Sequence, residues 1–292
     1  MNILITGGGG VIGSCLTKYL SAKHNVFDLS ISPDVHLQFD LLKILDNEIT
    51  NVLLGKKIDI IIHCAAKIET ATLEDFYLNS FALNKFFINE IGKKKRYIVI
   101  GSAAEYGAAG RSGLINENTF PAPSSFYGSS KLLQTTLCHY YFNLGLDVQV
   151  LRLFNIIAPT LPNRTFIGSL LEEVKKGKEG RVKISNLKIE RDFLDLRDFC
   201  NLLSAMIDCP AKSFLYNIAT GQNITYEFFL NKVAAILKQY NLSCPEVLVS
   251  DKEEVFDTAL CDTSKLANDY SWRPFYNLQD SILWCLKEIK LI

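Results

Sequence analysis

The sequence predicts an α/β protein with a doubly wound parallel sheet and a smaller C-terminal lobe. The first observation is a set of short apolar segments without the polar alternation of half-exposed strands, so both faces of each are expected to be buried. The second is that longer segments with apolar residues near helical spacing lie between them. Regular alternation of strand and helix predicts parallel strands joined by right-handed crossovers, as in a Rossmann fold. The expected strands are residues 2–6, 25–29, 58–63, 97–101 and 148–153, and the expected helices are residues 11–20, 73–91 and 126–144.

This alternation loosens after about Pro159, where Pro162 and the charged segment VKKGKEGR follow. We therefore expect a first domain over residues 1–160 and a smaller lobe formed mainly by residues 161–292. Segments near residues 190–220 are expected to return to the first domain.

Composition excludes several classes of protein. The 292 residues are 48% hydrophobic and 21% charged, as in an ordinary globular protein, and the 31 basic residues balance the 31 acidic ones. Without a basic field, neither nucleic acid nor an anionic membrane is an expected partner. The eight cysteines never form a C-x-x-C pair and the four histidines show no ligand spacing, so we expect no metal site. Scattered cysteines also argue against a disulfide framework, so we expect the protein to reside in the reducing cytoplasm. We expect neither a signal peptide nor a membrane span, because no run of about 18 apolar residues occurs.

A glycine-rich segment follows the first expected strand. Gly7, Gly10 and Gly13 have the spacing G-x-x-G-x-x-G between that strand and the first expected helix. Glycine permits a tight turn and a close approach to a pyrophosphate, while the helix N-terminus supplies free N–H groups. A glycine-rich turn without a ligand is the alternative. The position at the start of a strand–helix–strand series favours dinucleotide binding.

An acidic residue near the end of the second strand is expected to bind the ribose hydroxyls of the dinucleotide. Asp28 is the candidate, and Ser30 takes that place if the strand runs longer. No Arg or Lys follows within this loop to bind a 2′-phosphate, which favours NAD over NADP. Asp40 either caps the next helix or faces the adenine.

A candidate catalytic group lies further along the chain. Tyr127 and Lys131 are four residues apart in FYGSSK, hence on one face of a helix. A neighbouring ammonium favours the phenolate of a tyrosine, whose ordinary pKa is near 10. Ser102 follows the fourth strand, at the edge where ligands of such sheets bind. The alternative for the tyrosine–lysine pair alone is a surface helix pair.

These motifs resemble those of the extended short-chain dehydrogenase/reductases, in particular the nucleotide-sugar epimerases, dehydratases and reductases, over nearly the whole chain. The matching segments are TGGGGVIG, IIHCAA, LRLFN and RDFLDLRD. The resemblance implies an NAD-binding Rossmann domain and a lobe that binds a nucleotide-diphosphate sugar. It places Ser102, Tyr127 and Lys131 on the catalytic positions, with Ser102, Asn155 and Arg191 at the substrate. The implied cofactor contacts are Gly7, Gly10, Val11, Ile12, Gly13, Asp28, Asp40, Leu41, Ala65, Ala66, Asn79, Tyr127 and Lys131.

Departures from the family pattern narrow the reaction. Sugar 4,6-dehydratases carry Asp-Glu after the catalytic Ser or Thr, where this chain has Ala103 and Ala104. Combined 3,5-epimerase/reductases carry a Cys and a His where this chain has Ala104 and Thr160. Hydride chemistry at carbon 4 of the sugar remains. We therefore expect an NAD-dependent nucleotide-sugar 4-epimerase, with a nucleotide-4-keto-sugar reductase as the alternative and a non-catalytic cofactor-sensing protein as a third reading.

The segments 73–91 and 126–144 carry apolar residues on more than one face. In the resembling family these helices pair across a two-fold axis, so a homodimer is expected. The alternative is that the extra apolar faces only pack on the sheet.

Overall fold

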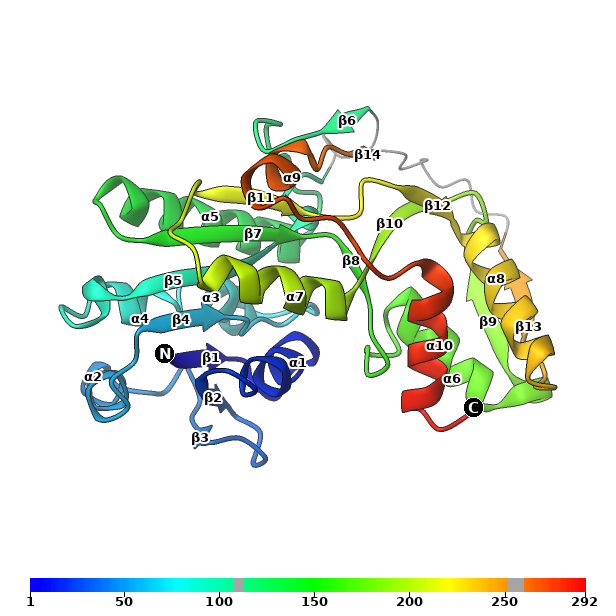
Figure 1. The fold of residues 1–292 in the computed structure, drawn as a ribbon, viewed down its shortest axis with the longest axis horizontal. Helices are drawn as coiled ribbons and strands as arrows, with labels where there is room; N and C mark the ends of the chain where they lie inside the picture. The colour runs from blue at the N-terminus through cyan, green and yellow to red at the C-terminus, as the bar shows by residue number, and fades with distance from the viewer. Residues whose placement is uncertain (108–112, 251–259) are drawn as a thin grey trace.

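The computed structural model describes residues 1–107, 113–250 and 260–292, and its centre is a 7-stranded parallel sheet (Figure 1). The strand order is β11-β7-β5-β4-β1-β2-β3, with every pair parallel. The order reverses between β1 and β4, which is the switch point of a doubly wound sheet. The predicted fold class is confirmed. The strands are β1 Asn2–Thr6, β2 Asn25–Ser30, β3 Leu37–Gln38, β4 Ile60–His63, β5 Arg96–Ser102, β7 Val148–Leu153 and β11 Leu215–Ile218.

Helices cover both faces of this sheet, because successive strand residues point to opposite sides. Ile3 and Ile5 of β1 face the helices α1 and α7, whereas Leu4 faces the layer that contains α2, α4 and α5. Both faces of β1 are therefore buried, as the continuous apolar run predicted. The helices are α1 Val11–Leu20, α2 Asp46–Gly55, α3 Leu73–Ser80, α4 Asn84–Phe87, α5 Phe126–Asn143, α7 Leu196–Ile207 and α9 Ser264–Tyr270.

One expected helix is broken. We predicted a single helix over residues 73–91, but the structure has α3, a turn, the short α4 and the 3-10 turn Gly92–Lys94. The N–H of Ala82 donates to the carbonyl of Tyr77, five residues back, so the regular helical ladder is lost there. The side-chain oxygen of Asn89 then accepts hydrogen bonds from the N–H groups of Ile91 and Gly92. These bonds replace the backbone hydrogen bonds that a continued helix would form.

The helices α3 and α5 pack against each other and leave aromatic side chains exposed. Tyr77, Phe126 and Tyr140 are exposed, whereas Leu83 and Phe87 are fully buried within the chain. Some of the additional apolar side chains of these segments thus pack within the chain, and the homodimer stays a prediction.

A smaller lobe stands beyond the carboxyl ends of the main strands (Figure 1). Its apolar core comes from α6, α8, α10 and β9. After α7, the chain returns to the main sheet, where β11 pairs with β7. The boundary at residue 160 stays a prediction. The elements of this region are β8 Asn155–Ile157, α6 Phe166–Lys175, β9 Arg181–Ile184, β10 Glu190–Asp195, β12 Asn223–Thr225, α8 Tyr226–Gln239, β13 Glu246–Val249 and α10 Leu278–Glu288. Two short strands, β6 Leu114–Ile115 and β14 Leu260–Cys261, pair with each other.

Within the described residues, no helix is both long enough and apolar enough to cross a membrane.

Candidate functional site

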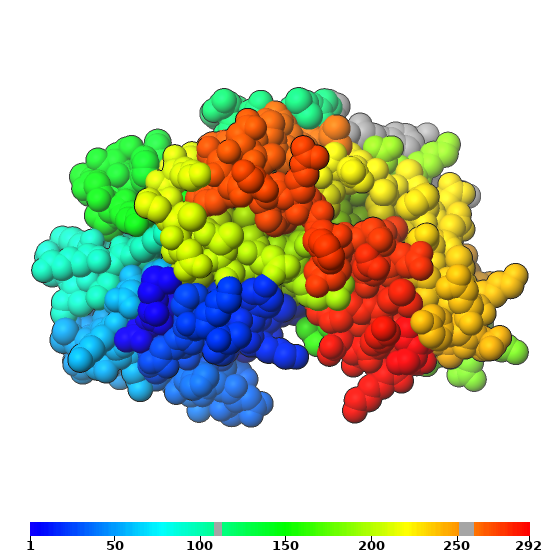
Figure 2. Space-filling model, in the orientation of Figure 1, coloured from blue at the N-terminus to red at the C-terminus, as the bar shows by residue number. Residues whose placement is uncertain are grey.

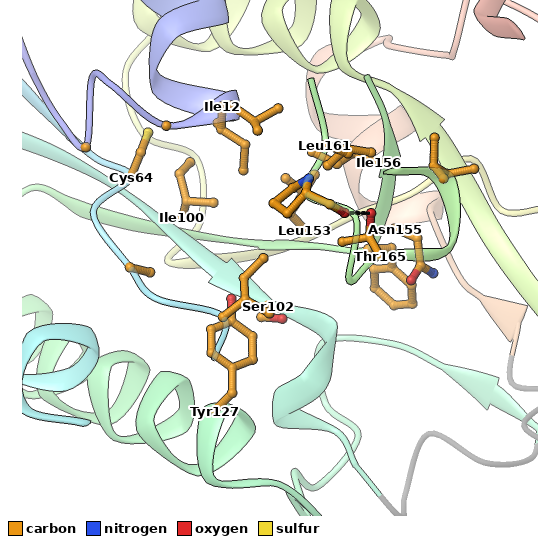
Figure 3. Close-up of a pocket in the computed structure, with 18 of the residues that line it drawn as sticks. Ile12, Cys64, Ile100, Ser102, Tyr127, Leu153, Asn155, Ile156, Leu161 and Thr165 are labelled. Atoms are coloured by element: carbon orange, nitrogen blue, oxygen red, sulfur yellow. Dashed lines mark hydrogen bonds between the residues drawn. The ribbon is translucent and has the colours of Figure 1, made fainter. Parts of the chain in front are cut away.

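A cavity of about 640 Å³ lies between the carboxyl ends of the main strands and the smaller lobe (Figure 3). Its walls come from the glycine loop, the ends of β4 and β5, the start of α5, β8 and the segment that leads into α6. The sheet edge and the second lobe thus enclose one site, as expected for an open α/β sheet. The predicted residues that line it are Gly7, Gly10, Val11, Ile12, Gly13, Ala66, Ser102, Tyr127, Lys131 and Asn155.

The glycine loop fits a dinucleotide phosphate group. Gly7 has a φ of +73°, and a Cβ there would lie 2.7 Å from the backbone nitrogen of Ala65. A Cβ on Gly13 would lie 2.2 Å from the Gly7 carbonyl oxygen, so α1 can approach the loop only without side chains at these positions. Gly10 caps α1 without a side-chain hydrogen bond to its N–H groups. The helix N-terminus therefore keeps donors for an anion.

Asp28 does not line this cavity. Its side chain lies under Gly8, where an added Cβ would come 2.3 Å from the Asp28 Cβ. Its carboxylate accepts the backbone N–H of His36 at 2.9 Å and also contacts the His36 ring. The strand β2 runs on to Ser30, whose hydroxyl lies beside Gly9. The structure thus places both alternatives of the sequence analysis next to the glycine loop, and the ribose contact of Asp28 stays a prediction.

Asn79, Asp40 and Leu41 also lie outside the cavity lining. The amide of Asn79 donates to the Lys67 carbonyl and to the hydroxyls of Thr70 and Ser130, and it accepts the Lys67 N–H. It therefore ties the loop after β4 to α5. Asp40 accepts the N–H of Leu42 in a turn, and the N-cap of the next helix, α2, is Leu45, so the expectation that Asp40 caps that helix is wrong. Leu41 is buried in the apolar layer behind the sheet.

Tyr127 and Ser102 meet at the edge of the sheet, with the phenol directed toward Ser102 (Figure 3). Ser125 caps α5 by accepting the N–H of Gly128 at 3.0 Å. A Cβ on Gly128 would come 2.4 Å from the carbonyl oxygen of Ala104, so α5 packs closely on the turn after β5. This approach brings the helix that carries Tyr127 to the strand end that carries Ser102.

The charge arrangement corrects one expectation. Lys131 was expected to lower the pKa of Tyr127, but burial raises that pKa, against an opposing hydrogen bond with Ser102. The Lys131 ammonium donates instead to the Ile100 carbonyl at 2.6 Å and to the Gln134 side chain at 2.5 Å. Because Lys131 is 2% exposed, burial lowers its own pKa to about 8. Lys131 lines the cavity from beside the tyrosine without pairing with it.

A buried ion pair that sequence reasoning missed supports the turn behind Ser102. Glu105 Oε2 accepts from Arg152 Nε at 2.8 Å, and Glu105 Oε1 accepts the Ser102 N–H at 2.9 Å. Both charged side chains are almost completely buried. One partner of the pair, Arg152, lies in LRLFN, the same segment that contains Asn155. Its acidic partner, 47 residues away, could not be identified from spacing.

Asn155 lines the cavity at the start of β8 and donates to the Asp192 carbonyl at 3.1 Å. Arg191 lies on β10 outside the cavity lining and donates to the Glu190 carbonyl. Arg164, which the sequence analysis did not consider, lines the cavity and forms an exposed ion pair with Glu69 at 3.4 Å. Asn155 thus lies at the cavity, whereas the contact of Arg191 with the substrate stays a prediction.

His63 is a packed residue at the end of β4. It is completely buried, and its Nδ1 lies 2.7 Å from the Thr6 hydroxyl. Burial, with a smaller contribution from Lys131, lowers its pKa to about 3. In the described part of the chain, no group of three His, Cys, Asp or Glu side chains is placed to hold a metal ion.

Comparison with known proteins identifies the family. Residues 3–219 match the NAD dependent epimerase/dehydratase family. The chain is 26% identical over 233 residues to GDP-6-deoxy-D-mannose reductase of Pseudomonas aeruginosa, covering 75% of each chain. It is 26% identical over 283 residues to GDP-6-deoxy-D-talose 4-dehydrogenase of Aggregatibacter actinomycetemcomitans, covering 92% of this chain and 90% of that one.

A solved structure has the same fold. UDP-glucuronic acid 4-epimerase of Bacillus cereus, in complex with UDP-glucuronic acid and NAD, matches with a TM-score of 0.81 at 22% identity. The match covers 100% of this chain and 99% of that chain. NAD is the cofactor that the family description names. The resemblance seen in the sequence is confirmed, and the chain belongs to the NAD dependent epimerase/dehydratase family.

Proposed function

We propose that this chain is an NAD-dependent nucleotide-sugar 4-epimerase that acts through a transient 4-keto sugar. The observation that carries the proposal is the meeting of Tyr127 and Ser102 on the wall of the cavity that the glycine loop also lines. A proton-transfer group and a dinucleotide site in one enclosure suit oxidation and reduction of a secondary carbinol.

The roles of the residues follow from their positions. The glycine loop would hold NAD, which would supply hydride transfer to and from the sugar carbon. Tyr127 takes the hydroxyl proton as the carbonyl forms and gives it back on reduction, while the Ser102 hydroxyl donates a hydrogen bond to the same substrate oxygen. Proton removal uses the phenolate, which the hydrogen bond with Ser102 favours, and proton return uses the phenol, which burial favours by raising the pKa of Tyr127. Lys131 holds the strand end through the Ile100 carbonyl and places a positive charge behind the cofactor site.

The turn after Ser102 supports hydride chemistry over dehydration. Ala103 and Ala104 supply no acid or base, and the only carboxylate of that turn, Glu105, is fully buried and engaged by Arg152. Elimination of water needs an acid and a base at the reacting carbons. Thr160, which stands where the combined 3,5-epimerase/reductases carry a His, lines a different cavity and therefore supplies no acid or base at this site.

The nucleotide-diphosphate part of the substrate is assigned to the side of the cavity formed by the smaller lobe. Asn155 supplies an amide there and Arg164 a guanidinium. The exposed Glu69 that pairs with Arg164 is a weak competitor for a diphosphate, because exposed ion pairs contribute little. Remote contacts of this kind orient the sugar at Tyr127.

A one-way nucleotide-4-keto-sugar reductase is the second candidate. It is favoured by the two curated relatives, a reductase and a 4-dehydrogenase of GDP-6-deoxy sugars, at 26% identity. A reductase must exchange its cofactor in each cycle, whereas an epimerase regenerates NAD within one enclosed cycle.

Product analysis separates the two candidates. The purified protein is incubated with GDP-, UDP- and dTDP-sugars that carry deuterium at carbon 4, with no added cofactor. The epimerase predicts interconversion of one sugar with its 4-epimer, with the deuterium retained and no accumulation of NADH. A strict requirement for stoichiometric NADH or NADPH, with a 4-keto sugar as the substrate, would establish the reductase instead.

A further inference from the structure

Two cysteines far apart in the sequence meet behind the glycine loop. Cys15 of α1 and Cys200 of α7 are 185 residues apart, and their sulfur atoms are 3.5 Å apart. The two helices pack against each other on the same face of the sheet. The contact is thus fixed by the packing of two regular elements.

One of the two thiols can be reached from outside. A second cavity, of about 760 Å³, is lined by Cys15 together with Lys18, Arg197, Tyr276 and Trp284. In Figure 2 the surface is hollowed where α1, α7 and the segment around α10 meet. Cys15 is half-buried at this cavity and Cys200 is fully buried behind it. A small reagent therefore meets Cys15 first.

The surroundings also differ between the two sulfurs. The hydrogen bond between the two thiols lowers the pKa of Cys15, with smaller contributions from Lys18 and Arg197, whereas burial and Asp195 oppose the shift. The pKa of Cys200 is raised, first by the same hydrogen bond and then by burial. The sulfur that lines the cavity is thus also the one whose pKa is lowered, which is the usual arrangement of an attacking cysteine with a resolving partner.

We propose that Cys15 and Cys200 form a hydroperoxide-sensitive thiol pair that closes to an intramolecular disulfide between α1 and α7. The Cys15 thiolate attacks one peroxide oxygen, the O–O bond breaks, and the departing hydroxide leaves as water with the proton that Cys15 had released. The Cys200 sulfur then attacks the sulfur of the Cys15 sulfenic acid, and the hydroxyl leaves as water with the Cys200 proton. Two thiols are oxidised and one hydroperoxide is reduced.

The movement required is small. A disulfide has a sulfur–sulfur distance of about 2.05 Å, so the two atoms approach by roughly 1.5 Å from their present separation. Cys15 lies two residues after Gly13, in the helix whose first residues, Val11 and Ile12, line the main cavity. The bond fixes that helix against α7.

Peptide mapping of the full chain tests the pair. The protein is treated with hydrogen peroxide, unreacted thiols are alkylated, and peptides are mapped without reduction. We expect a cross-linked peptide containing Cys15 and Cys200, lost again after treatment with dithiothreitol. Cys244→Ser, which removes an exposed cysteine, is the matched control and should still form the cross-link.

The variant Cys200→Ser gives a second and independent readout. With its resolving thiol removed, Cys15 should stop at the sulfenic acid and be labelled by dimedone, whereas the wild type should show little label. The proposal is overturned if both Cys15 and Cys200 remain alkylated in peroxide-treated wild type. It is also overturned if Cys15 is labelled equally in the two proteins with no cross-linked peptide in the wild type.

Discussion

Glu105 and Arg152 form an ion pair beneath the strand end that carries Ser102, with 2.8 Å between Glu105 Oε2 and Arg152 Nε. The other carboxylate oxygen accepts the Ser102 N–H, so one side chain joins the turn after β5 to the neighbouring strand β7. The guanidinium also stacks over the ring of Tyr106, 4.6 Å from its centroid. The strand end that carries Ser102 is thus supported by a charge pair away from water.

Glu105→Gln should lower the free energy of unfolding by about 3 kcal/mol, because it leaves the Arg152 charge buried without its counter-ion. Urea unfolding followed by fluorescence measures the change. Glu172→Gln removes a carboxylate from a much more exposed pair and should change stability by less than about 0.5 kcal/mol. Equal effects of the two substitutions would contradict a special role for the buried pair.

Gly13→Ala should weaken NAD binding by about tenfold or more, because the added methyl group would lie 2.2 Å from the Gly7 carbonyl oxygen and displace the loop. Calorimetric titration with NAD measures the effect. Gly55→Ala is the matched control, since nothing lies within 4 Å of a Cβ at that helical position. Unchanged affinity in Gly13→Ala would argue against the loop as the phosphate site.

The burial of His63 predicts that the protein loses stability in acid. Its pKa is about 3 in the folded protein and 6.5 ordinarily, so the unfolded chain binds a proton that the folded chain excludes. Stability should therefore fall as the pH drops from about 6.5 towards 3, by up to about 1.4 kcal/mol per pH unit from this group. This contribution should be missing in His63→Gln and present in His139→Gln, which changes an exposed histidine. The same pH slope in His63→Gln as in the wild type would refute the assignment.

Cofactor preference is a separate prediction. The wild type should bind NAD more tightly than NADP, and Asp28→Ala should narrow the difference, because a carboxylate near the ribose repels a 2′-phosphate. Competitive titration of the two dinucleotides measures it. If Asp28→Ala leaves the difference in affinity between NAD and NADP unchanged and Ser30→Asp enlarges it, the ribose contact belongs to Ser30. The hydrogen bond that Asp28 accepts from the His36 backbone would be consistent with that result.

Local patterns predicted much of this molecule. The apolar runs gave the bounds of β1 and β7, and the helical spacing of Tyr127 and Lys131 placed both on α5. Long-range partners could not be predicted in the same way. The binding of Asp28 by His36 and of Glu105 by Arg152 depends on how loops and strands meet in space. The pKa of Tyr127 likewise depends on burial, which spacing does not reveal.

Replacement of Tyr127 tests the central claim most directly. Tyr127→Phe should retain folding and NAD binding but lose about 10²-fold or more of its turnover of the sugar, the scale of general acid–base catalysis. Tyr140→Phe changes an exposed tyrosine of the same helix and should keep full turnover. Turnover by Tyr127→Phe within a few-fold of the wild type would contradict the assignment of Tyr127 as the proton-transfer group.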